Sequence, residues 1–385
     1  MMGDRNMATE SPSQKPLRVL HVTFNMGIGG TEQVIRQLVQ GMIPEGVESE
    51  ILCIDGQIGP IGETLQQSGV PVHKLTRKQG FDWSLVAGIR KRLREGRFDV
   101  VHCHQYTPWL YGWLAALGTG ARVVFTEHGR FYPDRHRYKA MLINPLIALL
   151  TSAVVAISSA TKDALVRYEF IPRKKIQVIY NGISPLNRNA LETQKVRDRL
   201  GIPQDAFVVG TVSRLDPVKN QSMMLRAFKE FFEHCPGSYL LMVGDGPDKE
   251  KLIRLSADLG ISERTIFTGF INNPVNELSA IDVFLLSSLT EGTSMTLLEA
   301  MSLGIPSVVT DVGGNPEIVN HNVTGLVTKS NEKSEFASAI TEIYKCRNKR
   351  KEISIAALEQ FHDKFTRKKF VSDYLSIYHS VRKHH

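Results

Sequence analysis

Short apolar runs rich in β-branched residues alternate with amphipathic stretches of helical period along most of this chain. In the first half, these runs predict strands at residues 17–24, 50–54, 99–103, 122–126, 153–157 and 177–180. In the second half, they predict strands at residues 207–212, 239–243, 265–268, 283–286, 307–310 and 325–327. Such alternation is typical of parallel sheets that helices cover on both faces. The pattern therefore predicts an α/β protein with two doubly wound sheets.

A length of 385 residues suits two domains better than a single core. Each half resembles a Rossmann-like domain, in which ligands bind where the carboxyl ends of the strands meet. A polar stretch between the two sets of strands reads as the linker. We expect a disordered tail, a first domain, the linker, a second domain and a terminal helix at residues 1–16, 17–185, 186–204, 205–364 and 365–385.

One strongly apolar segment, residues 140–157, has nearly the length of a membrane crossing. Asn144, Pro145, Thr151 and Ser152 interrupt it, and its last residues have strand character. We therefore expect a buried helix of about twelve residues followed by a core strand, and no membrane span.

The net charge of +8 belongs entirely to the first half of the chain. Residues 1–195 contain 24 lysines and arginines against 16 acidic residues, whereas residues 196–385 contain 23 of each. This asymmetry indicates an anionic partner for the first half, such as acidic lipid headgroups, a phosphorylated acceptor or nucleic acid, with a merely solubilising surface as the alternative. A basic and aromatic group is the candidate for contact with an anionic membrane: Arg130, Phe131, Tyr132, Arg135, Arg137 and Lys139.

The cysteines are scattered, and none forms a C-x-x-C pair. This usage fits a reducing compartment with thiols as small core residues. Residues 1–16 lack the apolar region of a signal peptide. We expect a cytoplasmic protein, with peripheral association at the inner face of the membrane as a further expectation.

Two carboxylates stand eight residues apart in the stretch Glu291-Gly-Thr-Ser-Met-Thr-Leu-Leu-Glu299. Glu299 lies in an apolar helical segment and has no Lys or Arg three or four residues away. A buried carboxylate without a partner is unfavourable, so a ligand that carries hydroxyl donors is a candidate partner for it. The alternative is a structural carboxylate that caps a neighbouring helix.

A glycine-rich turn follows the first strand, with the sequence Gly27-Ile-Gly29-Gly30-Thr31-Glu32. Glycines allow the backbone to approach a ligand closely and direct helix N–H groups at it. The dinucleotide fingerprint needs a third glycine where Glu32 stands, and its charge would repel a pyrophosphate. We therefore disfavour NAD and expect a loop that lines an acceptor cleft, with a structural tight turn as the alternative.

The first strand of the second half ends in a loop that carries Arg214 and Lys219. Two cations at this position suit a diphosphate, because arginine makes bidentate contacts and lysine supplies a point charge. Gly244 follows the next strand, and the pair Gly269-Phe270 follows the third, where main-chain groups could bind a nucleotide. Each feature alone fits an ordinary solvated turn, but together they follow successive strand ends.

Three motifs of the second half together resemble glycosyltransferase family 4: Val-Ser-Arg214-Leu-x-x-x-Lys219, Val-Gly244-Asp-Gly-Pro and Glu291-x7-Glu299 followed by Ala-Met-x-x-Gly304-x-Pro306. The resemblance covers the chain from Leu17 onward. It implies the GT-B architecture of two facing Rossmann-like domains, and a retaining enzyme that uses a sugar nucleotide. It also implies that the terminal segment returns to the first domain.

The resemblance implies roles for individual residues. The donor diphosphate would lie on Arg214 and Lys219, the donor sugar against Glu291, and the ribose hydroxyls on Glu299. The remaining donor-binding positions are Gly244, Gly269, Phe270, Gly292, Thr293, Ser294 and Met295. On the acceptor side, Gly29 and Gly30 match the family's glycine loop, and His128 matches its strand-end histidine.

Some positions depart from the family's pattern. Asn181-Gly-Ile is followed by Ser184 where the family often has aspartate, and Gly292-Thr-Ser294 stands where Gly-Phe-Gly is frequent. These departures leave the reaction class intact but leave the sugar and the acceptor unassigned.

No Asp-x-Asp triplet occurs in the chain, so the usual carboxylate clamp for a divalent metal is missing. We expect Arg214, Lys219 and the helix that begins near Thr293 to stabilise the leaving diphosphate, with no metal and no other cofactor. His128 is the candidate for contact with the reacting sugar or for accepting the acceptor's proton. His102 and His104 share one strand face, but no further pair has zinc spacing, and we expect His104 to face the acceptor cleft.

The sequence therefore predicts transfer of a hexose-type sugar from a UDP- or GDP-sugar to a glycan or lipid-linked acceptor. Two alternatives are a sugar-nucleotide epimerase of the same architecture and a non-catalytic basic protein that binds membranes. We expect no nucleic-acid partner.

Overall fold

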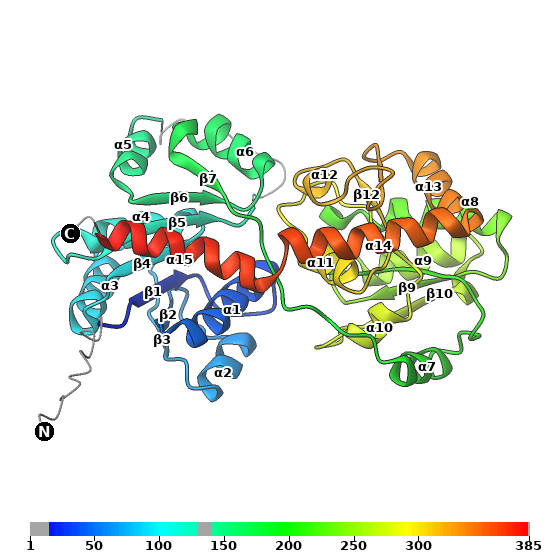
Figure 1. Ribbon diagram of the computed structural model, residues 1–385, viewed down its shortest axis with the longest axis horizontal. Helices are drawn as coiled ribbons and strands as arrows, with labels where there is room; N and C mark the ends of the chain where they lie inside the picture. Colours follow the sequence, from blue (N-terminus) through cyan, green and yellow to red (C-terminus); the bar gives the residue numbers. More distant parts are fainter. Residues whose placement is uncertain (1–14, 130–140, 384–385) are drawn as a thin grey trace, which may run out of the picture.

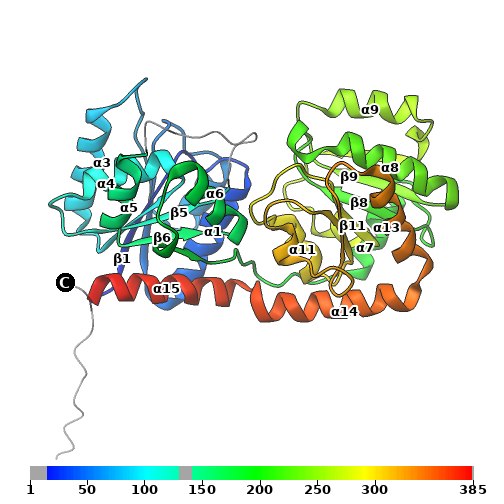
Figure 2. The same cartoon turned by 90° about the horizontal axis from the view of Figure 1, so that it is seen from above.

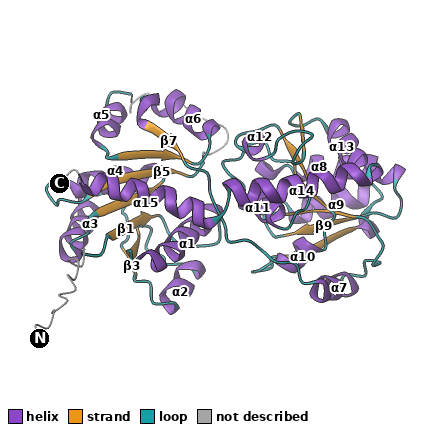
Figure 3. Ribbon diagram, in the orientation of Figure 1, coloured by secondary structure: helices purple, strands orange, loops and turns teal. Residues whose placement is uncertain are grey.

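A computed structural model describes residues 15–129 and 141–383 of the chain. The described residues form two α/β lobes, each built on an all-parallel sheet (Figures 1 and 3). The basic group proposed for membrane contact, Arg130 to Lys139, lies outside the described residues.

The first sheet has seven strands in the order β3-β2-β1-β4-β5-β6-β7. These strands are β1 (Arg18–Thr23), β2 (Glu48–Cys53), β3 (Val72–Lys74), β4 (Val100–His104), β5 (Arg122–Glu127), β6 (Ala153–Ala156) and β7 (Ile176–Val178). The helices of this lobe are α1 (Gly30–Met42), α2 (Pro60–Gln67), α3 (Trp83–Gly96), α4 (Tyr106–Ala116), α5 (Ile143–Leu150) and α6 (Ser159–Glu169). All the predicted strands are present, and only the short edge strand β3 was missed.

The second sheet has six strands in the order β10-β9-β8-β11-β12-β13. They are β8 (Val208–Val212), β9 (Tyr239–Val243), β10 (Thr265–Gly269), β11 (Val283–Leu286), β12 (Ser307–Thr310) and β13 (Leu326–Thr328). Its helices are α7 (Ala190–Arg199), α8 (Gln221–His234), α9 (Lys249–Asp258), α10 (Val275–Ser279), α11 (Met295–Ser302), α12 (Asn315–Ile318) and α13 (Lys333–Lys345). The stretch expected as a linker thus contains α7, whose Arg197 donates to main-chain oxygens of the second lobe.

Burial of the strands on both faces explains why they read as continuous apolar runs. Every residue of β4, β6, β8, β11 and β12 is buried, as parallel strands under two helical layers require. Local caps fix where the covering helices begin. Asp82 accepts from the N–H groups of Ser84 and Leu85 at the start of α3, and Ser158 accepts from Thr161 N at the start of α6. The carboxyl ends of the strands are therefore held by rigid elements.

Two consecutive helices at the end of the chain run along both lobes (Figure 2). α14 (Arg347–Lys364) packs against α11 in the second lobe, and α15 (Arg367–Lys383) packs against α1 in the first. Phe370, Tyr374 and Tyr378 of α15 are buried in the core of the first lobe. The terminal helix therefore belongs structurally to the first lobe and links it to the second.

The segment expected as a buried helix differs from the prediction. α5 buries only Asn144, Ile147 and Ala148, while Leu142, Leu146 and other aliphatic side chains around it are more than half exposed. The prediction of a buried helix was wrong because both faces of α5 are apolar and periodicity does not show which one meets solvent. Among the helices of the described residues, none combines the length and apolarity that a bilayer crossing requires.

Candidate active site between the two lobes

Three turns at the carboxyl edge of the second sheet pack directly on one another. The N–H of Gly244, after β9, donates to the carbonyl oxygen of Gly269, after β10, at 3.0 Å. Gly244 has φ +140°, and a Cβ there would collide with the carbonyl oxygen of Ser213, after β8. Phe270, which follows Gly269, leaves about half of its side chain exposed. The sequence-predicted donor positions on these turns are therefore brought together.

Lys219 and Glu291 form an ion pair at this edge. Asp216 caps the 3₁₀ turn Pro217–Lys219 by accepting from the N–H groups of Val218 and Lys219. Lys219 Nζ then donates to Glu291 Oε1 at 2.5 Å, and Ser288 Oγ donates to the same oxygen at 2.6 Å. The glutamate side chain is 9% exposed and the lysine side chain 24% exposed. Since an ammonium group has three N–H donors, Lys219 can hold Glu291 and still bind a second anion.

Arg214 lies on the same turn but extends into solvent, with its side chain 72% exposed. Within the described part of the chain, its nearest acidic partner is Asp216, at 3.8 Å from Nε to Oδ2. Its main chain is fixed, because Gln221 Nε2 donates to the Arg214 carbonyl oxygen at 2.8 Å. The structure thus places both predicted cations on one turn, with only Lys219 held against the protein.

Helix α11 begins at Met295, and Ser294 is its N-cap, accepting from Leu297 N. The loop before it is pressed against the first lobe: Thr293 Oγ1 donates to the carbonyl oxygen of Ile157 at 2.7 Å. A side chain at Gly292 would meet Ile157 Cδ1 at 2.7 Å. The positive end of this helix therefore lies at the junction of the lobes, where it favours negative charge.

Glu299, on α11, faces Arg36 of α1 in the opposite lobe. Burial raises the pKa of Glu299 to about 7, and the positive charge of Arg36 opposes that rise. Burial also lowers the pKa of Arg36, whose Nε has no hydrogen-bond partner among the described residues. The Glu299 side chain is only partly buried. Sequence reasoning found this carboxylate but not its cation, because Arg36 is 263 positions away in the chain.

The glycine turn of the first lobe lies at the start of α1, with Gly29 as its N-cap. A side chain at Gly29 would collide with the carboxylate of Glu32. Burial raises the pKa of Glu32, and the nearby charge of Asp55 adds to the rise. At Gly30, by contrast, nothing lies within 4 Å of an added Cβ. Because only the flexible end of the Glu32 side chain stands near an added Cβ, close packing among the described residues does not require glycine at either position.

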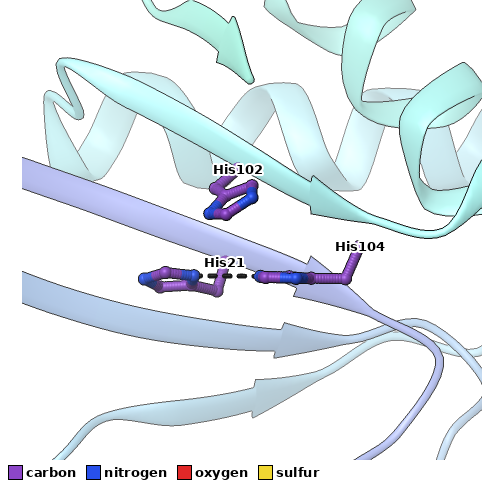
Figure 4. Close-up of side chains that lie close together, drawn as sticks. All are labelled: His21, His102 and His104. Atoms are coloured by element: carbon purple, nitrogen blue, oxygen red, sulfur yellow. Dashed lines mark hydrogen bonds between the residues drawn. The ribbon is translucent and has the colours of Figure 1, made fainter. Parts of the chain in front are cut away.

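Three histidines form a buried histidine cluster, defined here as His21, His102 and His104 (Figure 4). His21 comes from β1, and the other two come from the neighbouring β4. His21 Nδ1 and His104 Nε2 are 3.1 Å apart, and His104 Nδ1 is 2.8 Å from Nε2 of His128 at the end of β5. Burial lowers the pKa of His21 and of His128 to about 3, so both rings are neutral at pH 7.

The expectation that His104 faces the acceptor cleft is wrong, because its side chain is completely buried between His21 and His128. The sequence pattern could not show this, because it does not predict that β4 lies between β1 and β5 in the sheet. Among the described residues, one group has ligand atoms close enough for a metal ion, and it is the buried histidine cluster. However, both ring nitrogens of His102 already bond hydroxyl groups, of Tyr378 and Thr126.

A second carboxylate reaches across the junction and was missed in the sequence. Glu317, on α12, accepts from the N–H groups of Ser159 and Ala160 at 2.7 and 2.9 Å, at the start of α6. Tyr180 Oη donates to the same side chain at 2.9 Å. Here a carboxylate of one lobe caps a helix of the other, so this contact links the two lobes.

Comparison with known proteins assigns the chain to a family. The model described as "Glycosyltransferase Family 4" matches residues 28–185, and that described as "Glycosyl transferases group 1" matches residues 192–360. This chain belongs to glycosyltransferase family 4. It is therefore an enzyme that transfers a sugar from a sugar nucleotide, as the sequence predicted.

Curated relatives cover most of this glycosyltransferase. The Escherichia coli UDP-Gal:alpha-D-GlcNAc-diphosphoundecaprenol alpha-1,3-galactosyltransferase is 27% identical over 85% of this chain and 88% of its own length. The Bacillus anthracis N-acetyl-alpha-D-glucosaminyl L-malate synthase is 27% identical over 78% of this chain and 80% of its own.

Solved structures share the fold. A Rickettsia africae glycosyltransferase has a TM-score of 0.86 at 20% identity, covering 97% of this chain and all of its own. The Anabaena protein HepE, in complex with UDP, has a TM-score of 0.83 at 23% identity, covering 95% of this chain and all of its own. These likenesses and the two parallel sheets confirm the GT-B architecture.

Proposed function

We propose that this glycosyltransferase moves a hexose-type sugar from a UDP-sugar to a glycan or lipid-linked acceptor, with retention of the anomeric configuration. One observation carries the proposal: the Lys219–Glu291 pair lies at the carboxyl edge of the second sheet, in the loop region before α11. Lys219 would bind the donor diphosphate and Glu291 the donor sugar, so the pair holds both sides of the bond that breaks.

Charge development explains how these groups would act. Cleavage of the sugar–phosphate bond produces positive charge at the anomeric carbon and negative charge on the diphosphate. Lys219, Arg214 and the N-terminus of α11 would stabilise the departing oxygens without a metal ion, and Glu291 would lie near the positive centre. The glutamate and lysine are already fixed by Ser288 and by the cap at Asp216, so little reorganisation is needed.

Two further features support the choice of nucleotide. Glu299 is a partly buried carboxylate of raised pKa, and hydroxyl donors such as those of a ribose would stabilise its charged form. We prefer UDP as the nucleotide of the donor because the Anabaena neighbour binds UDP and UDP-glucose and the Escherichia coli relative is named for UDP-Gal. No observation favours the epimerase or the non-catalytic interpretation.

A thermal-shift screen followed by a transfer assay tests the donor. UDP should raise the melting temperature more than GDP or ADP, because a ligand that binds only the folded state stabilises it. A labelled UDP-hexose should then give a glycoside whose anomeric configuration matches the donor's. A larger shift with GDP would overturn the choice of base, and an inverted product would overturn retention.

We also propose that the acceptor is membrane-borne and that the surface around α5 rests on an anionic lipid layer at the cytoplasmic face. Leu142, Leu146 and Leu149 expose 83%, 58% and 60% of their surface, an unusual density of aliphatic side chains for an eight-residue helix and its N-cap. Lys175 Nζ donates to the Leu149 carbonyl oxygen at 3.4 Å, and Lys174 is exposed beside it. Apolar side chains bordered by lysines suit an anionic interface.

Vesicle co-sedimentation tests this contact. The enzyme should bind vesicles that contain phosphatidylglycerol more strongly than neutral vesicles, and Leu146→Ser with Leu149→Ser should weaken binding roughly tenfold or more. The matched control is Leu191→Ser, because Leu191 is 70% exposed but lies on α7 in the other lobe. Equal loss in the control, or equal binding to both vesicle types, would overturn the assignment. A dimer that dissociates in the Leu146 and Leu149 variant would instead show that a second copy covers the surface.

A further inference from the structure

The turn before α12 packs main chain against main chain on the donor loop, defined here as residues 291–294. A Cβ on Gly313 would stand 1.8 Å from the carbonyl oxygen of Glu291, and one on Gly314 would stand 1.9 Å from that of Gly292. The N–H of Gly314 also donates to the Glu291 carbonyl oxygen at 3.2 Å. Because only glycine fits at these distances, α12 is joined closely to the donor loop.

The donor loop and this turn both lie against the first lobe, where β6 ends and α6 begins. Thr293 Oγ1 donates to the carbonyl oxygen of Ile157 at 2.7 Å. A Cβ on Gly292 would stand 2.7 Å from Ile157 Cδ1, and one on Gly314 would stand 3.2 Å from Ser158 Cβ. The donor loop therefore takes its place in the site partly from residues of the opposite lobe.

Glu317, on α12, fastens the next residues of the first lobe to the same place. One carboxylate oxygen accepts from Ser159 N and Tyr180 Oη, and the other accepts from Ala160 N, at 2.7 to 2.9 Å. The two main-chain donors belong to the first turn of α6, where no intrahelical acceptor exists. α6 and α12 face one another across the junction (Figure 1). Glu317 therefore supplies acceptors that its own helix does not use and that the start of α6 needs.

We propose that Glu317 is a positioning residue for sugar transfer. By holding the start of α6 against α12, it keeps the donor loop seated on the first lobe, so that the donor half and the acceptor half of the site stay aligned. Glu317 acts through the main chain of its neighbours and needs no contact with substrate. The effect on catalysis rests on the proposed role of Glu291, whereas the contact between the lobes does not.

The number and the charge of its hydrogen bonds distinguish Glu317 from the other groups at this contact. Thr293 makes one neutral hydrogen bond to the first lobe, whereas Glu317 makes three with a carboxylate, and such bonds are roughly twice as strong. A displacement of about 1 Å between reacting groups can lower a rate about a hundredfold. Loss of this contact should therefore slow transfer much more than it weakens donor binding, because Lys219 and Arg214 both belong to the second lobe.

Fluorescence energy transfer between dyes on the two lobes tests the contact without substrate. Cys346 is exposed on the second lobe and the other three cysteines are buried, so Gln67→Cys on α2 adds the labelling position in the first lobe. In this background, Glu317→Gln should shift and broaden the distribution of transfer efficiency, because the amide has one acceptor oxygen in place of two. An unchanged distribution would overturn the proposal.

Steady-state kinetics of the transfer of a labelled UDP-hexose test the effect on catalysis. Glu317→Gln should lower kcat roughly tenfold or more, while the Kd of UDP stays within about twofold of the wild-type value. Tyr180→Phe conserves the ring and removes one of the three donors, so it should lower kcat by about two- to fivefold. If UDP binding weakened as much as kcat fell in Glu317→Gln, the proposal would be overturned in favour of a general loss of structure.

Asp82→Asn is the matched control, because Asp82 also caps a helix with its carboxylate but does so inside one lobe. It accepts from the N–H groups of Ser84 and Leu85 at the start of α3. This variant should lower the melting temperature, as Glu317→Gln does, but leave kcat and the distribution of transfer efficiency unchanged. An equal fall of kcat in this control would overturn the proposal. If no sugar were transferred from a UDP-hexose, the proposed function would fail, and the dye measurement would still decide whether Glu317 holds the lobes together.

Discussion

Replacement of Lys219 by methionine should separate the structural from the chemical role of the Lys219–Glu291 pair. The variant removes one charge from the pair. The Glu291 carboxylate, whose side chain is 9% exposed, then keeps the Ser288 hydroxyl as its only side-chain hydrogen-bond donor among the described residues. Loss of one partner of a fully buried pair costs about 3–5 kcal/mol. The lysine is 24% exposed, so we expect a loss of about 2–3 kcal/mol in the free energy of unfolding.

The double variant Lys219→Met/Glu291→Gln removes both charges. Its free energy of unfolding should return to within about 1 kcal/mol of the wild type, because no charge is then stranded. Its transfer rate should stay at least about a hundredfold below the wild type, because the donor diphosphate still lacks its cation. Urea unfolding and initial-rate measurements on the same preparations give the two quantities.

A surface pair provides the matched control. Lys229 and Glu233, on α8, form an ion pair of 3.3 Å in the same lobe, with side chains 36% and 58% exposed. Lys229→Met should change the free energy of unfolding by less than about 0.5 kcal/mol and leave transfer unaffected. The reasoning would be refuted if Lys219→Met were as harmless as Lys229→Met, or if the double variant kept the wild-type rate.

Three further predictions follow from the junction, the turns and the core. Glu317→Gln should reduce the free energy of unfolding by about 1–2 kcal/mol in urea titrations, because the carboxylate caps α6 of the other lobe, whereas Glu335→Gln, whose exposed side chain accepts from a loop N–H within one lobe, should not. Gly244→Ala should destabilise by more than about 2 kcal/mol, since φ is +140° and the added carbon would meet a carbonyl oxygen, while Gly237→Ala has open space and serves as control. Burial lowers the pKa of each member of the buried histidine cluster, so only the unfolded chain takes up these protons below about pH 6.5. As the pH decreases from there, these three rings should lower the free energy of unfolding by about 4 kcal/mol per pH unit. A flat profile of the free energy of unfolding between about pH 6 and 4 would contradict this.

The sequence predicted the sheets well because buried parallel strands carry their signal locally. The strand β3 was missed because it has only three residues, Val72–Lys74, of which one is buried. The helix expected within residues 140–157 was predicted to be buried, and this was wrong for a different reason. Its apolar residues face both ways, and only the three-dimensional arrangement shows that Ile147 meets the core and Leu146 does not.

The sequence predicted individual residues of the candidate site better than it predicted which residues they contact. Lys219 and Glu291 stand in loops that follow strands, and Glu299 stands within a helix, all of which local patterns identify. Their partners depend on tertiary structure: Arg36 approaches Glu299 from the other lobe, and Glu317 reaches the start of α6. The burial of the histidine cluster likewise depends on the order in which β1, β4 and β5 pair, which periodicity does not give.

Calorimetric titration of UDP into chelator-treated enzyme tests the central claim most directly. If side-chain cations and the N-terminus of α11 hold the diphosphate, UDP should bind with the same Kd before and after chelation. Arg214→Gln should weaken binding about tenfold or more, the value of one charge-assisted contact. Binding that disappears with chelator and returns with added magnesium or manganese, or an Arg214→Gln variant with an unchanged Kd, would contradict the account.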